Sequence, residues 1–158
     1  MNTKSDLVLL EPGSLYFGRA PKVIQTLLGS CVALTAWHPT LLVGGMCHYL
    51  LPEKKASKKE HGPTYGIDAL KVIEQHLKSY GHPDEFEFGL FGGSQMLCDE
   101  GLYAIGRDNI NTANVWLKRN HLSVTHESLG GSMARRLKLD LQTGTIDLVS
   151  NSLQQDAR

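Results

Sequence analysis

Two short apolar runs on either side of a turn constrain the fold of this chain more than any other feature. They cover residues 31–37 and 42–51, and the four residues between them read "HPTL". Each run has the length of a β-strand, and proline is favoured in turns. The pattern therefore predicts an antiparallel hairpin, whose successive side chains alternate between two faces.

The register of this hairpin selects one cysteine and one histidine. If "HPTL" forms the turn, Trp37 lies opposite Leu42. The same register places Cys31 opposite His48 on one face, with Cβ atoms roughly 4.5–5.5 Å apart. Cys47 then points to the other face. The pair depends on the turn, because a turn one residue shorter or longer would separate Cys31 from His48.

A cysteine beside a histidine is typical of cysteine hydrolases. The imidazole stabilises the nucleophilic thiolate and later delivers a proton to the leaving group. Gly29 and Ser30 precede Cys31, and their backbone N–H groups would point at a developing oxyanion. The alternative is a buried cysteine beside a histidine without catalysis, and the pair alone does not decide between the two.

Other chemistries fit the sequence less well. We expect no metal, because the C-x-x-C and H-x-x-x-H spacings of zinc sites are missing. The glycine pairs at 92–93 and 130–131 match no phosphate-binding loop, so we expect no cofactor. Arg135 and Arg136 are expected at a solvated strand start. The residues considered as ligands for the zinc site that we do not expect are Cys31, Cys47, His48 and Cys98.

The remaining patterns predict an α+β sandwich in one domain, residues 1–158, because strands outnumber helices and the two mix irregularly. Residues 52–63 are rich in lysine and are expected to form an exposed loop, and residues 151–158 a flexible tail. Two helices are predicted, one over 65–81 ending at Gly81 and one from Asp108 or Asn109 to about His121. A strand is predicted over 85–91, ending at Gly92 and Gly93. A hairpin with its turn at Thr143 and Gly144 follows near the end of the chain.

Composition excludes several classes of protein. The 158 residues fit one domain, and 16 basic residues balance 16 acidic ones, so we expect no binding to nucleic acid. No apolar run approaches the roughly 20 residues of a membrane-spanning helix, and the N-terminus lacks a signal-peptide core. Membrane insertion is therefore not expected. Three cysteines without a disulfide pattern indicate reduced thiols and a cytoplasmic location.

The motif "TLLGSCVAL", followed by "GGMCHYLLP", resembles the signature of the CheD family, the chemoreceptor glutamine deamidases of bacterial chemotaxis. The resemblance continues in "FGGSQM", "AIGRDN", "LGGSMARR" and "TGTIDLV", and it covers nearly the whole chain, from about Gly13 to Val149. The family implies a layered α/β/β arrangement with mixed β-sheets, which agrees with the fold expected from the residues.

The resemblance also implies roles for individual residues. By position, Cys31 is the nucleophile, His48 the general acid/base and Thr26 the third residue, which orients His48. The spacing from Thr26 to Cys31 is one residue shorter than in some members. Ala134 stands where many members have glycine.

The implied reaction converts glutamines on the helical cytoplasmic bundles of chemoreceptors to glutamate through a thioester on Cys31. A CheC-type phosphatase is a second implied partner. Two other functions stay open: a non-catalytic adaptor that binds chemoreceptors or such a phosphatase, and a methylesterase that acts on glutamate esters. The lysine-rich loop either steers an acidic receptor helix toward the site or is an ordinary solvated loop.

Overall fold

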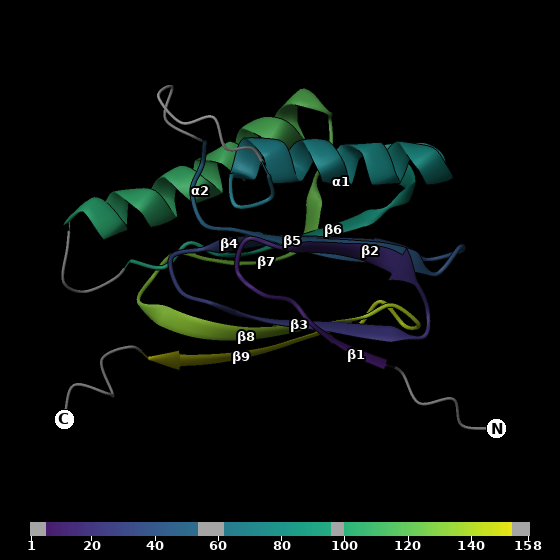
Figure 1. Cartoon of the computed structure of the whole chain (residues 1–158), viewed down its shortest axis with the longest axis horizontal. Helices are drawn as coiled ribbons and strands as arrows, with labels where there is room; N and C mark the ends of the chain where they lie inside the picture. Colours follow the sequence, from purple (N-terminus) through teal and green to yellow (C-terminus); the bar gives the residue numbers. More distant parts are fainter. Residues whose placement is uncertain (1–5, 54–61, 96–99, 153–158) are drawn as a thin grey trace.

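The chain folds into three layers, with the helices on a five-stranded sheet and this sheet on a four-stranded one (Figure 1). The structure is a computed structural model that describes residues 6–53, 62–95 and 100–152. The predicted α+β fold with a layered α/β/β arrangement is confirmed.

Both sheets are mixed. The five-stranded sheet contains, in spatial order, β2 (Leu15–Arg19), β5 (Val43–Tyr49), β4 (Val32–His38), β6 (Glu87–Gly92) and β7 (Val124–Leu129). The four-stranded sheet contains β1 (Asp6–Leu9), β3 (Lys22–Leu28), β8 (Met133–Asp140) and β9 (Ile146–Ser152). The helices are α1 (Gly66–Tyr80), α2 (Glu100–Arg119) and the short 3-10 helix η1 (Pro83–Glu85). Parallel pairing joins β1 to β3 and β6 to β7, and the other neighbours are antiparallel.

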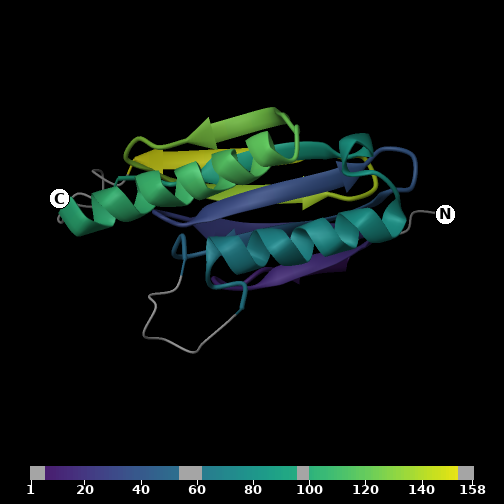
Figure 2. The same ribbon diagram turned by 90° about the horizontal axis from the view of Figure 1, so that it is seen from above.

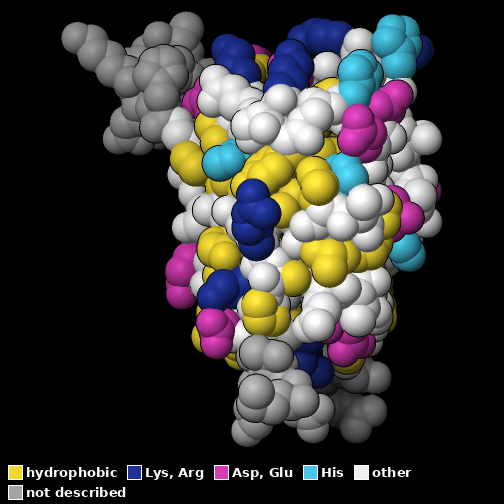
Figure 3. Space-filling view, turned by 90° about the vertical axis from the view of Figure 1, so that its right-hand side faces the viewer, with side chains coloured by type: hydrophobic (Ala, Val, Ile, Leu, Met, Phe, Trp, Pro, Cys, Tyr) yellow, Lys and Arg dark blue, Asp and Glu magenta, His cyan; other side chains and the backbone are white. Residues whose placement is uncertain are grey.

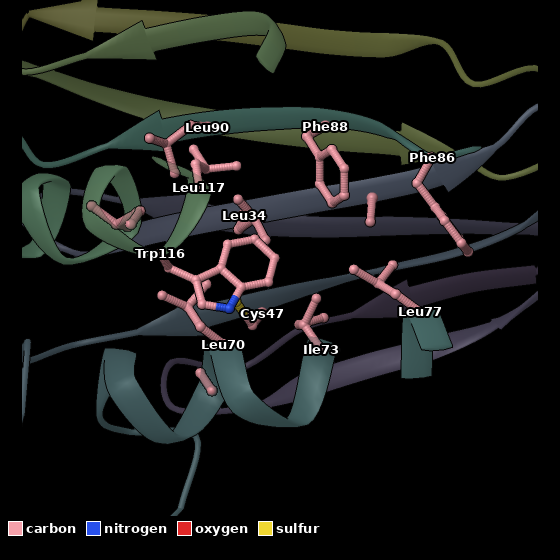
Figure 4. Close-up of a cluster of buried hydrophobic side chains, with 14 of the residues drawn as sticks. Leu34, Cys47, Leu70, Ile73, Leu77, Phe86, Phe88, Leu90, Trp116 and Leu117 are labelled. Atoms are coloured by element: carbon pink, nitrogen blue, oxygen red, sulfur yellow. The ribbon is translucent and has the colours of Figure 1, made fainter. Parts of the chain in front are cut away.

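The apolar runs of the hairpin are explained by the central place of β4 and β5. Both strands are covered on one face by the helices and on the other by the four-stranded sheet, so they carry few polar residues. Viewed from above, α1 and α2 lie side by side across the sheet (Figure 2). Cys47 points toward these helices and lies among Leu34, Leu70 and Trp116 (Figure 4). A second apolar cluster fills the space between the two sheets.

The predicted hairpin register is wrong by two residues. His38 pairs with Val43, so the turn covers residues 39–42 instead of 38–41. The reason is that the His38 ring closes the turn itself, because its Nδ1 accepts the backbone N–H groups of Thr40 and Leu41. His38 thereby stays in the strand as its last paired residue.

The two helices match their predictions unequally. The helix predicted over 65–81 is confirmed within one residue at each end, with Gly81 as its C-cap. The second helix begins at Glu100, well before the predicted start at Asp108 or Asn109. Gly106 weakens the helical pattern of this first part, since glycine has a low helix propensity. A Cβ on Gly106 would lie 2.7 Å from the carbonyl oxygens of Gly93 and Ser94, so only glycine lets the helix approach them.

Other predicted segments are confirmed or fall outside the described residues. The hairpin with Thr143 and Gly144 in its turn is formed by β8 and β9. Residues 151 and 152 belong to β9, so the expected tail does not begin at 151, and 153–158 lie outside the described residues. Most of the expected lysine-rich loop, residues 54–61, also lies outside them. Neither described helix has the length and apolar character needed to cross a membrane.

One face of the molecule carries side chains of both charges. On the end of the molecule that lies to the right in Figure 1, acidic, basic and histidine side chains are interspersed with apolar ones (Figure 3). The described acidic side chains include several that pair locally, such as Asp6 with Lys22 and Glu74 with Lys78. Exposed pairs of this kind contribute little to stability.

We predict that Gly106→Ala destabilises the protein, against the usual effect of this substitution in a helix. In an unconstrained helix the change stabilises by roughly 0.5–1 kcal/mol. Here the new methyl group meets two carbonyl oxygens, and overpacking of this kind costs about 1–3 kcal/mol. Urea unfolding should therefore show a lower midpoint. Asn114→Ala, at an exposed position of the same helix, is the control and should not lower it. An unchanged or higher midpoint for Gly106→Ala would contradict the close approach.

Candidate active site

Cys31 lies in the connection between the two sheets. The segment Gly29–Ser30–Cys31 follows β3 of the four-stranded sheet and leads into β4 of the five-stranded one. Cys31 is half-buried and packs against the apolar cluster between the sheets. The chain must change sheets at this point, so the thiol sits at the end of the inter-sheet space.

His48 lies on the face of β5 that points toward the same space. It pairs with Ala33, and Cys31 comes two residues before Ala33. Cys31 and His48 are therefore diagonal neighbours on one face, for which Cα distances are roughly 7–8 Å, instead of directly opposed as predicted. The error of two residues leaves the face unchanged, because side chains alternate with a period of two.

Thr26 contacts the His48 ring from the other sheet. It is buried on β3, and its Oγ1 lies 2.6 Å from His48 Nδ1. The same hydroxyl donates to the carbonyl oxygen of Leu10 at 2.9 Å. A carbonyl can only accept, so the single hydroxyl proton of Thr26 goes to Leu10. Oγ1 must then accept from His48, which assigns the proton of the neutral ring to Nδ1.

This tautomer leaves Nε2 of His48 as the nitrogen with a free lone pair. Nε2 is buried and has no hydrogen-bond partner among the described residues. An imidazole with Nδ1–H held and Nε2 unprotonated is the form that acts as a general base. The sequence contains Thr26 as a candidate, but no local pattern identifies Leu10, which lies after β1 and far along the chain from His48.

Burial keeps both reactive groups neutral at rest. It raises the pKa of the Cys31 thiol, and the backbone N–H of Cys31 itself opposes this only in part. Burial also lowers the pKa of His48 from 6.5 to about 4. The resting pair is therefore a thiol and a neutral imidazole rather than a thiolate and an imidazolium. Cys47 forms a thiolate even less readily, because its complete burial raises the pKa of its thiol to about 12.

The carbonyl groups of Gly29 and Cys31 accept backbone hydrogen bonds from the segment that follows β6. Gly29 O accepts from the backbone N–H of Ser94 at 3.0 Å, and Cys31 O accepts from that of Gly93 at 2.8 Å. In a trans peptide the N–H points opposite to the C=O. The N–H of Ser30 therefore points away from Ser94, and it donates to no other described residue. The N–H of Ser30, just before Cys31, is therefore free to face a ligand, and the role expected for Gly29 and Ser30 in binding an oxyanion stays a prediction.

Arg135 connects the two segments that contain the glycine pairs 92–93 and 130–131, next to the Gly29–Ser30–Cys31 segment. This side chain is buried, which contradicts the solvated position expected for it. Its guanidinium donates to Ser94 Oγ at 2.7 Å, Ser128 Oγ at 3.0 Å and Gly130 O at 2.8 Å. Ser94 in turn donates its backbone N–H to Gly29. Arg135 therefore supports the Cys31 segment from behind instead of facing solvent.

A groove of about 390 Å³ opens beside Gly29 and is lined by residues of β3, β8 and β9. A larger hollow of about 620 Å³ lies between α1 and α2 and is not at Cys31. Among the described residues, no group of histidine, cysteine and acidic side chains could hold a metal ion. Cys98 lies outside these residues, and Cys47 points away from His48 into the helix layer.

The fold and the site together define a class: an α+β protein in which a cysteine lies where two mixed sheets are joined, on the same face as a histidine that a threonine holds. A family model described as "CheD chemotactic sensory transduction" matches residues 50–150. A Dechloromonas aromatica protein is 38% identical over 143 residues, which cover 88% of this chain and 84% of the relative. A Pseudomonas fluorescens relative is 35% identical over 88% of this chain and 81% of its own. A Chromobacterium violaceum relative is 36% identical over 89% of this chain and 76% of its own.

These three relatives are each named "Probable chemoreceptor glutamine deamidase CheD", two of them with a number. The chain belongs to the CheD family. The resemblance carried by the sequence motifs is thereby confirmed.

The pKa of His48 predicts a loss of stability on acidification. The unfolded protein binds a proton on this ring below about pH 6.5, whereas the folded protein resists it until about pH 4. Unfolding therefore takes up a proton between these values, and the free energy of unfolding falls as the pH is lowered through them. At pH 4 the loss amounts to about 3 kcal/mol.

In His48→Gln this contribution is absent, because glutamine does not titrate. Urea unfolding between pH 7 and pH 4 should show a clearly smaller loss for the variant than for the wild type. Parallel pH curves for the two proteins would mean that His48 titrates normally in the folded state.

Proposed function

We propose that this protein is a protein-glutamine glutaminase that deamidates chemoreceptor glutamines, with Cys31 as nucleophile. The observation that supports this best is the hydrogen-bond chain from Leu10 O through Thr26 Oγ1 to His48 Nδ1, since it leaves a base at Nε2 on the face shared with Cys31. The names of the three relatives, each a probable chemoreceptor glutamine deamidase, support the substrate.

The first half of the reaction forms a thioester. His48 Nε2 takes the thiol proton as the Cys31 sulfur attacks the side-chain carbonyl carbon of the glutamine. Because the resting pair is neutral, proton transfer accompanies the attack. The N–H groups of Ser30 and Cys31 donate to the oxyanion, and removing one such donor typically costs 10²–10³ in rate. His48 then protonates the departing nitrogen, and ammonia leaves.

The second half releases the product. Water loses a proton to His48 Nε2 and attacks the thioester carbonyl. The carbon–sulfur bond breaks, the sulfur regains the proton from His48, and the glutamine has become a glutamate. Nothing in this sequence of steps needs a cofactor or a metal, because the attacking, proton-transferring and oxyanion-binding groups all belong to the chain.

The experiment is mass analysis of a chemoreceptor cytoplasmic fragment after incubation with the protein. We expect an increase of about 1 Da for each converted glutamine, since hydroxyl replaces amine in the acyl transfer. Cys31→Ser should abolish the increase, while Cys47→Ser, the matched control on the other face, should retain it. An increase with Cys31→Ser, or none with the wild type, would refute the proposal.

The same experiment decides between the alternatives. An adaptor without turnover would bind the fragment and leave its mass unchanged. A methylesterase would release methanol from glutamate methyl esters while leaving glutamine intact. A cytoplasmic location follows from the proposed substrate, and a CheC-type phosphatase remains a predicted partner that co-purification would test.

We predict that Thr26→Val lowers kcat/KM by roughly 10- to 100-fold, equivalent to about 1.4–2.7 kcal/mol. Valine keeps the shape but offers His48 Nδ1–H no acceptor, so the proton moves to Nε2 in part of the population and the base is lost. Ser30→Ala removes the nearest other hydroxyl and should retain activity, because the proposed mechanism uses only the backbone N–H of Ser30, which alanine keeps. Full activity of Thr26→Val in the deamidation assay would reduce the site to a cysteine–histidine dyad.

A further inference from the structure

Asn109 joins the two segments that carry Cys31 and His48. It lies on α2, its side chain is fully buried, and its Nδ2 donates to Ser30 O at 3.2 Å and to Leu50 O at 2.9 Å. Ser30 directly precedes Cys31, and Leu50 follows His48 by two residues. One amide group therefore holds the entry to the nucleophile and the end of the strand that bears the base.

The orientation of this amide is determined by its partners. Both are carbonyl oxygens, which only accept, so Nδ2 and not Oδ1 must face them. Oδ1 is buried and has no hydrogen-bond partner among the described residues. The backbone of Asn109 is itself held, because the Tyr49 hydroxyl donates to its carbonyl oxygen. The close contact of Gly106 with Gly93 and Ser94 fixes the same part of the helix.

Among the residues that the structure describes, Asn109 is the one whose side chain holds the peptide between Ser30 and Cys31. The neighbouring carbonyls of Gly29 and Cys31 are instead held by the backbone N–H groups of Ser94 and Gly93. The Ser30 carbonyl depends on Asn109. Because C=O and N–H point in opposite directions across a trans peptide, this hydrogen bond turns the N–H of Cys31 away from α2.

We propose that Asn109 is a positioning residue of the deamidation, which holds the Ser30–Cys31 peptide so that the Cys31 N–H donates to the oxyanion. The inference rests on the proposed function. It gives a role to the last residue of the motif "AIGRDN", which the sequence analysis placed only at the possible start of a helix. The residue touches neither the substrate nor the reacting atoms and acts through the peptide that it holds.

Two reactions of Cys31 distinguish this role from general support of the fold. Deamidation passes through an oxyanion, whereas alkylation of the thiol by iodoacetamide does not. In Asn109→Ala we expect kcat for deamidation to fall by roughly 10- to 100-fold, since a small misplacement of a catalytic group has effects of this size. KM and the alkylation rate of Cys31 should stay within about twofold. Asn114→Ala, an exposed asparagine on the same helix, should leave all three unchanged.

Several results would overturn the proposal. One is a folded Asn109→Ala that keeps its kcat, and another is a parallel loss of deamidation and alkylation. If Asn109→Ala does not fold, Asn109→Asp carries the same test, because it has nearly the same shape but places an oxygen against the two carbonyls. If neither variant folds, Asn109 serves the fold and the proposal is wrong. Failure of the proposed function is a separate result, namely no deamidation by the wild-type protein.

Discussion

The hydrogen bond between Thr26 and His48 is the contact on which the site depends. It crosses from one sheet to the other, and it has a defined direction only because Leu10 O takes the hydroxyl proton of Thr26. Three segments must therefore be in place together: the end of β1, the middle of β3 and the inner face of β5. The packing of the two sheets supplies this arrangement, so the chemistry of the ring is a consequence of the fold.

Burial between the sheets has two effects on the reactive pair. It disfavours charge on both groups, which lowers the pKa of His48 and raises that of Cys31. It also protects the hydrogen bonds that orient them from competition with water. A neutral pair has less thiolate at rest, but it keeps an unprotonated base on the same face as the thiol over the whole neutral pH range. In the proposed mechanism, negative charge develops only on the substrate oxygen, when the sulfur attacks the carbonyl carbon. Backbone N–H groups can stabilise the charge at that position.

The sequence predicted what depends on local pattern, and it missed what depends on packing between distant segments. Alternation in the hairpin placed Cys31 and His48 on one face, and the helix over 65–81 followed from its periodicity. The register was wrong because the His38 ring closes its own turn. The early start of α2 was missed because Gly106 looks like a helix breaker and is in fact a contact with Gly93 and Ser94. Every residue has a backbone carbonyl, so the residue pattern cannot indicate a contact such as that of Leu10 O with Thr26.

The most direct test of this account is the protonation of the His48 ring. In a ¹⁵N-histidine-labelled sample, nitrogen chemical shifts distinguish the two neutral tautomers and the imidazolium. His48 should be neutral at pH 7 with its proton on Nδ1, and it should remain so until the pH approaches about 4. A proton on Nε2 at pH 7, or titration near the ordinary histidine value of about 6.5, would contradict it.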